Sequence, residues 1–292
     1  MRKPFIYVIR KRGMGDVLWI EPVIRQLATK YRKVIVHTRY NVLFQNYPLA
    51  NVSFKSKQSL ISKLFSKLAL WIGRFPFFIN LDMSYENNPH CHFLHAYQMK
   101  SGLPQTNEYP MLFLSEGEKK ANLGGNSKYI LLHLESYSDK NYRKVFGIDW
   151  DKIAAYLGKK GYAVIQIGKE PIAIRNVTNM KTPNIRDIIS LIAQSNMFIG
   201  IDSGPSHFAA SLKVPALIFF GAVNPLYRHF PEQFNGYFLQ QDCEYAGCFH
   251  EQPKGKEPDC KLVGNFGIPK CSVHTDTYLI EHINKLLDAE RH

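Results

Sequence analysis

One βαβ unit can be read in residues 198–225, FIGIDSGPSHFAASLKVPALIFFGAVNP, and it sets the architecture expected of the whole chain. The apolar run 198–201 is typical of a buried strand, and residues 216–220 form a second such run. Between them, residues 203–206 predict a tight turn and residues 207–212 a short helix. Because ligands of such units bind beyond the carboxyl ends of the strands, we expect a binding site at this turn.

The chemistry of the turn suits a nucleotide phosphate. It offers a carboxylate, hydroxyls, an imidazole and the N-terminus of a helix, whose N–H groups and dipole favour an anion. The alternative is a polar turn that only caps the helix. The candidate ligand-binding residues are Asp202, Ser203, Gly204 and His207.

A second unit of this kind opens the chain. Residues 5–9, FIYVI, predict a strand, residues 17–31 a helix and residues 34–37 the next strand. The loop KRGMGD lies between the first strand and the helix, and Gly13 and Gly15 would let backbone amides approach a phosphate. The loop contains neither the full GxGxxG pattern nor a Walker A sequence, so the glycines alone are weak evidence. Asp16 can also be explained as the N-cap of the helix.

The remaining pattern predicts an α/β protein with two domains. Strands expected at residues 129–134 and 162–167 alternate with helices at 150–160 and 185–195, which is typical of a doubly wound parallel sheet. Residues 115–128 are polar and contain two adjacent glycines, as a linker would. We therefore expect domains at residues 1–122 and 123–292.

Composition and net charge limit the classes of partner that we expect. The chain of 292 residues is 45% hydrophobic, which excludes a disordered protein, and its net charge of +13 suits nucleic acid, an anionic membrane or phosphorylated substrates. The first apolar run is too short for a signal peptide, and no run approaches the ~20 residues that span a bilayer. We expect a cytoplasmic protein. A basic amphipathic helix over residues 60–71, extended by the apolar residues 75–79, either covers a sheet or rests on the inner face of the membrane.

Two segments together resemble a known family. Residues 7–27, YVIRKRGMGDVLWIEPVIRQL, and residues 198–225 resemble the two signatures of the heptosyltransferase-like glycosyltransferases, glycosyltransferase family 9. The resemblance implies a GT-B fold, in which two Rossmann-like domains face a cleft, with a short first domain here. It also implies inverting transfer of a sugar from a nucleotide donor, ADP-heptose above all, to a saccharide such as lipopolysaccharide or to a protein. No catalytic divalent metal is implied.

The resemblance assigns roles to particular residues. It makes Asp16 the base that deprotonates the acceptor, and Asp202, Ser203, Gly204 and His207 the residues that hold the donor nucleotide. Glu170 would lie near the nucleoside. A cation for the diphosphate is expected after the strand at 129–134. Because the family's Trp-Pro pair is missing, the choice stays open among three residues: Lys140, Arg143 and Lys144.

Four of the five cysteines lie in a segment rich in Gly, Pro and Lys, residues 240–273: Cys243, Cys248, Cys260 and Cys271. In a chain without a secretion signal, clustered cysteines bind metal more often than they form disulfides. A similar insertion in the autotransporter heptosyltransferases holds iron, and four thiolates suit zinc equally well. We expect a structural iron or zinc, with free or redox-active thiols as the alternative. Cys91 is interpreted as a small residue in a loop.

Two other functions compete with this interpretation. One is a basic nucleic-acid-binding protein with a four-cysteine metal site, although the basic residues are scattered and follow no nucleic-acid-binding pattern. The other is a non-catalytic, glycosyltransferase-like assembly protein, against which both signatures speak. The sequence leaves a homo-oligomer open.

Overall fold

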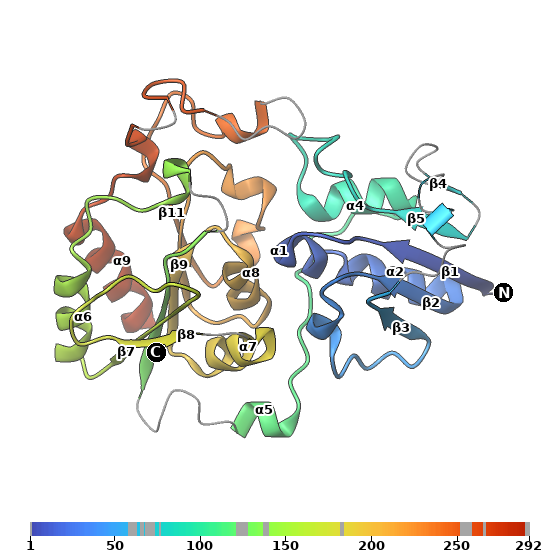
Figure 1. Ribbon diagram of the computed structural model, residues 1–292, viewed down its shortest axis with the longest axis horizontal. Coiled ribbons are helices and arrows are strands. Elements are labelled where there is room, and N and C mark those ends of the chain that lie inside the picture. The colour runs from blue at the N-terminus through green and yellow to red at the C-terminus, as the bar shows by residue number, and fades with distance from the viewer. Residues whose placement is uncertain are drawn as a thin grey trace. The chain divides into compact units, whose positions relative to one another are not determined.

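The computed structural model divides into two compact units, Met1–Ser115 and Glu116–His292. Each unit has its own sheet (Figure 1). The boundary predicted between residues 122 and 123 lies outside the described residues. The structure describes residues 2–57, 63–64, 67, 74–75, 77–120, 128–136, 140–181, 184–251, 259–264 and 267–289.

The N-terminal unit is built on a mostly parallel sheet. In chain order, its described elements are β1 (Lys3–Ile9), α1 (Met14–Leu18), α2 (Glu21–Lys30), β2 (Tyr31–His37), η1 (Asn41–Phe44), β3 (Val52–Lys55), β4 (Arg74–Phe75), β5 (Phe78–Asn80) and α4 (Phe93–Ser101). The strands lie in the order β3-β2-β1-β5-β4, with β4 antiparallel to β5. The predicted strands at 5–9 and 34–37 are confirmed, since β1 pairs in parallel with β2 and places Val8 opposite Val36.

The first predicted helix is wrong in its extent. The expected single helix over residues 17–31 is two helices, α1 and α2, which are separated at Trp19 and Ile20. Pro22 lies in the first turn of α2. Proline has no N–H and its ring disfavours helical geometry for the residue before it, so it starts a helix readily and does not continue one.

Most of the predicted amphipathic helix at 60–71 lies outside the described residues. Of its residues, the structure describes Lys63, Leu64 and Lys67, all in helical conformation. Among the helices of the described residues, none combines the length and the hydropathy needed to cross a membrane.

The C-terminal unit is a parallel α/β sheet flanked by helices. In chain order, its described elements are α5 (Glu116–Lys120), β6 (Tyr129–His133), η2 (Asn141–Arg143), α6 (Trp150–Lys159), β7 (Ala163–Gly168), β8 (Thr178–Lys181), α7 (Ile185–Gln194), β9 (Met197–Ile201), α8 (Gly204–Ser211), β10 (Ala216–Phe219), η3 (Pro225–Tyr227), η4 (Pro231–Gln233), β11 (Gly236–Leu239), η5 (Cys248–Glu251), η6 (Lys270–Ser272) and α9 (Asp276–Ala289). The predicted doubly wound sheet is confirmed. The edge strands β8 and β11 were not predicted, because each is four residues long and β8 is largely polar and exposed.

The order of these strands creates a topological switch point. The sheet runs β11-β10-β9-β6-β7-β8, so the chain moves outward from β6 in one direction and from β9 in the other. β6 and β9 are parallel neighbours, with His133 opposite Gly200. The loops that leave their carboxyl ends diverge at this point, and ligands of doubly wound sheets bind in the crevice that results.

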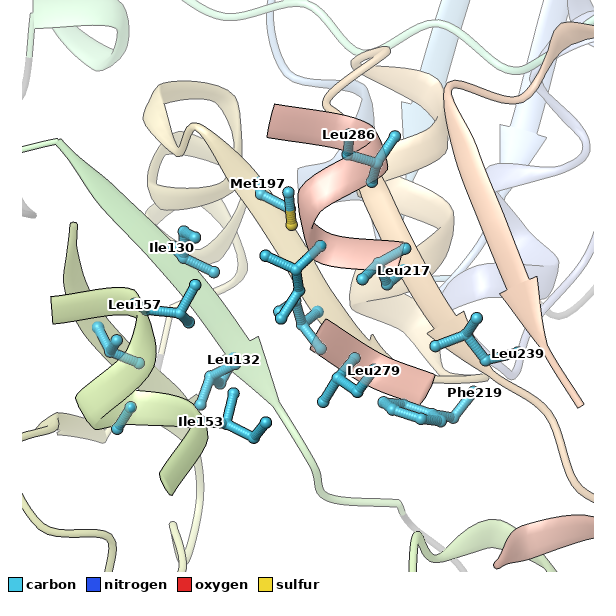
Figure 2. Close-up of a cluster of buried hydrophobic side chains, with 14 of the residues drawn as sticks. Ile130, Leu132, Ile153, Leu157, Met197, Leu217, Phe219, Leu239, Leu279 and Leu286 are labelled. Carbon is cyan, nitrogen blue, oxygen red and sulfur yellow. The ribbon is translucent and has the colours of Figure 1, made fainter. Parts of the chain in front are cut away.

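A continuous apolar core lies between the C-terminal sheet and the helices α6 and α9 (Figure 2). In Figure 1, α7 and α8 lie on the opposite face of this sheet. Burial of each such side chain stabilises the fold by about 1.5–3 kcal/mol. The side chains labelled in Figure 2 are Ile130, Leu132, Ile153, Leu157, Met197, Leu217, Phe219, Leu239, Leu279 and Leu286.

The N-terminal unit also contains a buried charged residue. Glu21 at the start of α2 has no exposed side-chain surface. Its carboxylate accepts hydrogen bonds from Arg25 Nε at 2.9 Å, Tyr47 Oη at 2.8 Å and the Met111 amide at 3.0 Å. Burial raises the pKa of Glu21, and the Arg25 charge acts against that rise. This carboxylate therefore connects α2 to two chain segments that lie far from it in sequence.

We predict that Glu21→Ala lowers the free energy of unfolding by about 2–4 kcal/mol, because it leaves buried donors without their acceptor. Urea denaturation measures the effect. The control is Glu281→Ala on α9, which removes an exposed ion pair to Lys285 and should leave the midpoint almost unchanged. Equal midpoints for the two variants would contradict this role of Glu21.

Candidate active site

The turn after β9 lies at the switch point and begins α8. Ser203 is the N-cap, Pro205 occupies the first turn, and the Ser203 amide donates to Ser206 Oγ at 3.2 Å. Ser203 Oγ lies 3.2 Å from Nδ1 of His133, the last residue of β6. The turn thus presents a helix N-terminus, with its positive dipole end, beside the end of β6.

Arg143 is a basic residue that the structure brings to this turn. Its Nη1 lies 3.7 Å from Oδ2 of Asp202 and 3.4 Å from the Asp202 carbonyl oxygen. Lys140, the residue just before η2, has its Nζ 4.0 Å from Oδ1 of Asp259 in the Cys-rich segment. Lys144 lines a small cavity together with Arg143 and Asp202. The structure thus joins Arg143 to the turn by an ion pair and turns Lys140 toward the Cys-rich segment.

One histidine approaches the Asp202 carboxylate, and a second histidine stacks on the first. His207 is 5% exposed, its Nε2 is 3.9 Å from Asp202 Oδ1, and its ring stacks on His229 with centroids 4.8 Å apart. His207 therefore supports the carboxylate from inside α8. His229 was not predicted, because it lies outside the signature and only the packing of the chain brings it there.

Glu170 follows β7, one strand away from the switch point. Its side chain is exposed, and its amide donates to Glu135 Oε1 at 2.6 Å, while the Lys169 amide donates to Oε2 at 2.8 Å. Glu135, in the loop after β6, therefore holds the loop after β7. The sequence offered no signal for Glu135, since a single acid in a polar loop has no pattern.

In the N-terminal unit, Asp16 forms an ion pair with Arg10. Arg10 Nη2 donates to Asp16 Oδ2 at 2.8 Å, and Tyr85 Oη donates to the same oxygen at 3.3 Å. Arg10 has 4% of its side chain exposed and also lies 3.4 Å from Glu86. The N-cap explanation of Asp16 is wrong, because Gly13 caps α1 and Asp16 lies within its first turn.

Gly13 is required by the position of Asp16. A Cβ atom on Gly13 would lie 1.9 Å from Asp16 Oδ2, and its φ of 75° is in the left-handed region that favours glycine. Gly15 is buried inside α1, where its carbonyl oxygen accepts from the Trp19 amide. A phosphate-binding role for the two glycines stays a prediction.

The four clustered cysteines line one cavity with a volume of about 10 Å³, enough for a single atom-sized occupant. Burial raises the pKa of the Cys248 thiol, and burial raises that of Cys271 to about 11. As the side chains lie, no group of three or more His, Cys, Asp or Glu within the described ranges is arranged to hold a metal ion. Cys91 belongs to the other unit and is not part of this cluster.

Comparisons with known proteins identify the family of the chain. The family model of glycosyltransferase family 9 (heptosyltransferase) matches residues 90–254. No curated protein sequence matches the chain.

Solved structures share the fold at low identity. The iron-containing dodecameric glycosyltransferase TibC from enterotoxigenic E. coli H10407 is 16% identical, with a TM-score of 0.77 over 99% of this chain and 77% of that chain. TibC in complex with ADP-D-β-D-heptose has a TM-score of 0.75 at 16% identity, over 98% and 76% of the two chains. The E. coli ADP-heptose lipopolysaccharide heptosyltransferase II is 15% identical, with a TM-score of 0.64 over the full length of both chains.

The family model covers more than half of the chain and includes the turn after β9 and Arg143, while the solved heptosyltransferases share its α/β fold with parallel sheets. The chain belongs to glycosyltransferase family 9, the heptosyltransferases, and is a glycosyltransferase of the GT-B fold.

Proposed function

We propose that the protein is an inverting heptosyltransferase, which moves heptose from ADP-heptose to a hydroxyl group of its acceptor. The observation that carries this proposal is the ion pair of Arg143 with Asp202 at the switch point of the C-terminal sheet. A helix N-terminus and a guanidinium at one strand end suit the diphosphate of a nucleotide sugar. The presence of ADP-D-β-D-heptose in TibC, which shares the fold, supports the choice of donor.

The donor half of the reaction is charge stabilisation. Breaking the glycosidic bond leaves negative charge on the ADP diphosphate, and Arg143 together with the N-terminus of α8 would stabilise it. Asp202, held by Arg143 and close to His207, would fix the orientation of this turn. The chain's own cation and amides can perform this step, so the proposal needs no catalytic divalent metal.

The acceptor half needs a base. Arg10 and Tyr85 both donate to Oδ2 of Asp16, which orients the carboxylate and leaves Oδ1 as the oxygen that takes the proton. The deprotonated hydroxyl then attacks the anomeric carbon opposite the departing ADP. One displacement of this kind inverts the configuration at that carbon.

The positive charge of the N-terminal unit favours an anionic saccharide as the acceptor over an uncharged protein surface. A hollow of about 440 Å³ lies at the carboxyl ends of β1, β2 and β3. Four of the residues that line it are Lys or Arg, which makes the hollow electropositive. Burial lowers the pKa of His37 in its wall, and the neighbouring charges of Lys11 and Lys55 lower it further. The residues that line the hollow are Lys11, His37, Thr38, Arg39, Ser56, Lys57 and Lys63.

The cysteine cluster fits a structural metal by its chemistry. Four thiols around an atom-sized cavity match the ligand set of tetrahedral iron or zinc. Cys243, Cys248, Cys260 and Cys271 would hold the ion, which would cross-link a segment with little apolar content. The iron content of TibC supports iron, and its dodecameric state supports a homo-oligomer for this chain as well. Because family membership makes the chain a glycosyltransferase, we propose neither nucleic-acid binding nor a non-catalytic assembly role.

The base is tested by Asp16→Asn, which keeps the shape of the side chain and removes its charge. We expect turnover to fall by roughly 10²–10⁴, with the dissociation constant of ADP-heptose unchanged. ADP release is measured with lipopolysaccharide from a heptose-deficient strain and, separately, with a bacterial surface protein as acceptor. Turnover near that of the unmodified protein would exclude Asp16 as the base.

The donor cation is tested by calorimetric titration with ADP. Arg143→Gln should raise the dissociation constant about 10- to 100-fold, since a charge-assisted hydrogen bond contributes about 1.5–3 kcal/mol. Lys140→Gln should have a much smaller effect, because Lys140 faces Asp259. The matched control is Arg175→Gln, which removes an exposed arginine paired with Asp151 in the same unit. A larger effect at Lys140 than at Arg143 would reverse the assignment.

The metal site is tested by elemental analysis of the purified protein. We expect about one equivalent of iron or zinc, as four thiolates complete one tetrahedral site. Cys260→Ser should lose the metal and make residues 240–273 sensitive to protease, because metal binding contributes directly to folding. Cys91→Ser is the control and should do neither. Metal-free protein that resists protease across this segment would rule the site out.

A further inference from the structure

Phe249 belongs to the Cys-rich segment, and its ring packs against two arginines. Its centroid lies 5.5 Å from Cζ of Arg143 and 5.8 Å from Cζ of Arg228. Arg143 is the residue paired with Asp202, and Arg228 is buried. One aromatic side chain therefore contacts two guanidinium groups, and one of these is paired with Asp202.

Phe249 is itself fixed by contacts on both sides. Its amide donates to the Ala222 carbonyl oxygen at 3.1 Å, and the preceding residue, Cys248, is buried beside Ala222. The next residue, His250, accepts at Nε2 from the Asn224 amide at 3.1 Å. Residues 248–250 are therefore attached to the loop that follows β10.

The basic loop, residues 140–146, carries Arg143 and is held by the Cys-rich segment. Asn141 Nδ2 donates to the Gly267 carbonyl oxygen at 3.1 Å, and the Phe146 amide donates to that of Ser272 at 2.9 Å. On the other side, a Cβ atom on Gly221 would lie 1.9 Å from the Tyr142 carbonyl oxygen. The loop that carries Arg143 is therefore packed between the Cys-rich segment and the loop after β10, in direct contact with each.

We propose that Phe249 is a positioning residue for the donor site, which holds the Arg143 guanidinium toward Asp202 and makes donor affinity depend on the Cys-rich segment. This inference rests on the proposed function, in which Arg143 binds the diphosphate. A free arginine side chain loses much rotational freedom when it binds a ligand, and a ring stacked on it removes that freedom beforehand. Loosening the segment should weaken donor binding without touching a donor-binding residue.

The test is calorimetric titration of the full-length protein with ADP. Phe249→Leu should raise the dissociation constant about threefold to thirtyfold, the range of a cation–π contact. Phe249→Trp keeps an aromatic face and should restore affinity to within about twofold of the unmodified protein. The control is Tyr237→Leu, which removes a half-exposed ring of β11 that packs on His282 and should leave ADP affinity unchanged.

A double-mutant cycle separates positioning from a general loss of structure. If Phe249 acts through Arg143, Phe249→Leu should have little further effect in the Arg143→Gln background. Additive effects of the two substitutions, or an unchanged dissociation constant for Phe249→Leu, would overturn the inference. If Phe249→Leu does not fold, the Phe249→Trp protein decides the question. An ADP dissociation constant more than about tenfold above that of the unmodified protein would overturn the inference.

ADP binding by the unmodified protein and by the two variants separates the positioning role of Phe249 from the proposed function. Unmodified protein that does not bind ADP would overturn both. ADP binding that is weakened by Arg143→Gln and unaffected by Phe249→Leu would overturn the positioning role alone and leave the donor assignment standing.

Discussion

The parallel pairing of β6 with β9 decides which loops meet at the carboxyl edge of the C-terminal sheet. Because the chain leaves these two neighbours in opposite directions, a crevice forms between the loops at the carboxyl edge of the sheet. The turn of Asp202 follows β9, and the basic loop with Arg143 follows β6. Hydrogen bonding in the sheet therefore brings together two loops whose residues are 59 positions apart in sequence, as the contact of Arg143 with the Asp202 carbonyl oxygen shows.

In the N-terminal unit, ion pairs order the candidate site around Asp16. Arg10 holds Asp16, the base that we propose, from a buried position. Burying a guanidinium is costly unless carboxylates surround it, and Asp16, Asp82 and Glu86 all lie within 4 Å of Arg10. The rings of Tyr85 and Tyr97 pack against it. Asp16 is therefore part of a connected cluster, and Gly13 supplies the space that the cluster needs.

The Cys-rich segment lies against the donor site that we propose. Its four thiols line one small cavity, and the metal that we propose there would add to the contacts that hold the segment in place. The same segment packs on the basic loop through Phe249, Gly267 and Ser272. A structural metal at this place would thus act on the donor site at a distance, through packing rather than through chemistry.

The sequence by itself determined the α/β class, the strands of both βαβ units, the Asp202 turn, the Asp16 loop and the clustering of cysteines. These features depend on local periodicity and on short patterns, which any single segment reveals. The tertiary structure alone decided that Arg143 meets Asp202, since Lys140, Arg143 and Lys144 are equivalent in sequence and differ only in what they face. It also showed that Arg10 and Tyr85 hold Asp16, that Glu135 holds the loop of Glu170, and that Phe249 packs on Arg143. Such contacts join residues far apart in the chain, and only the pairing and packing of whole strands and segments bring them within reach.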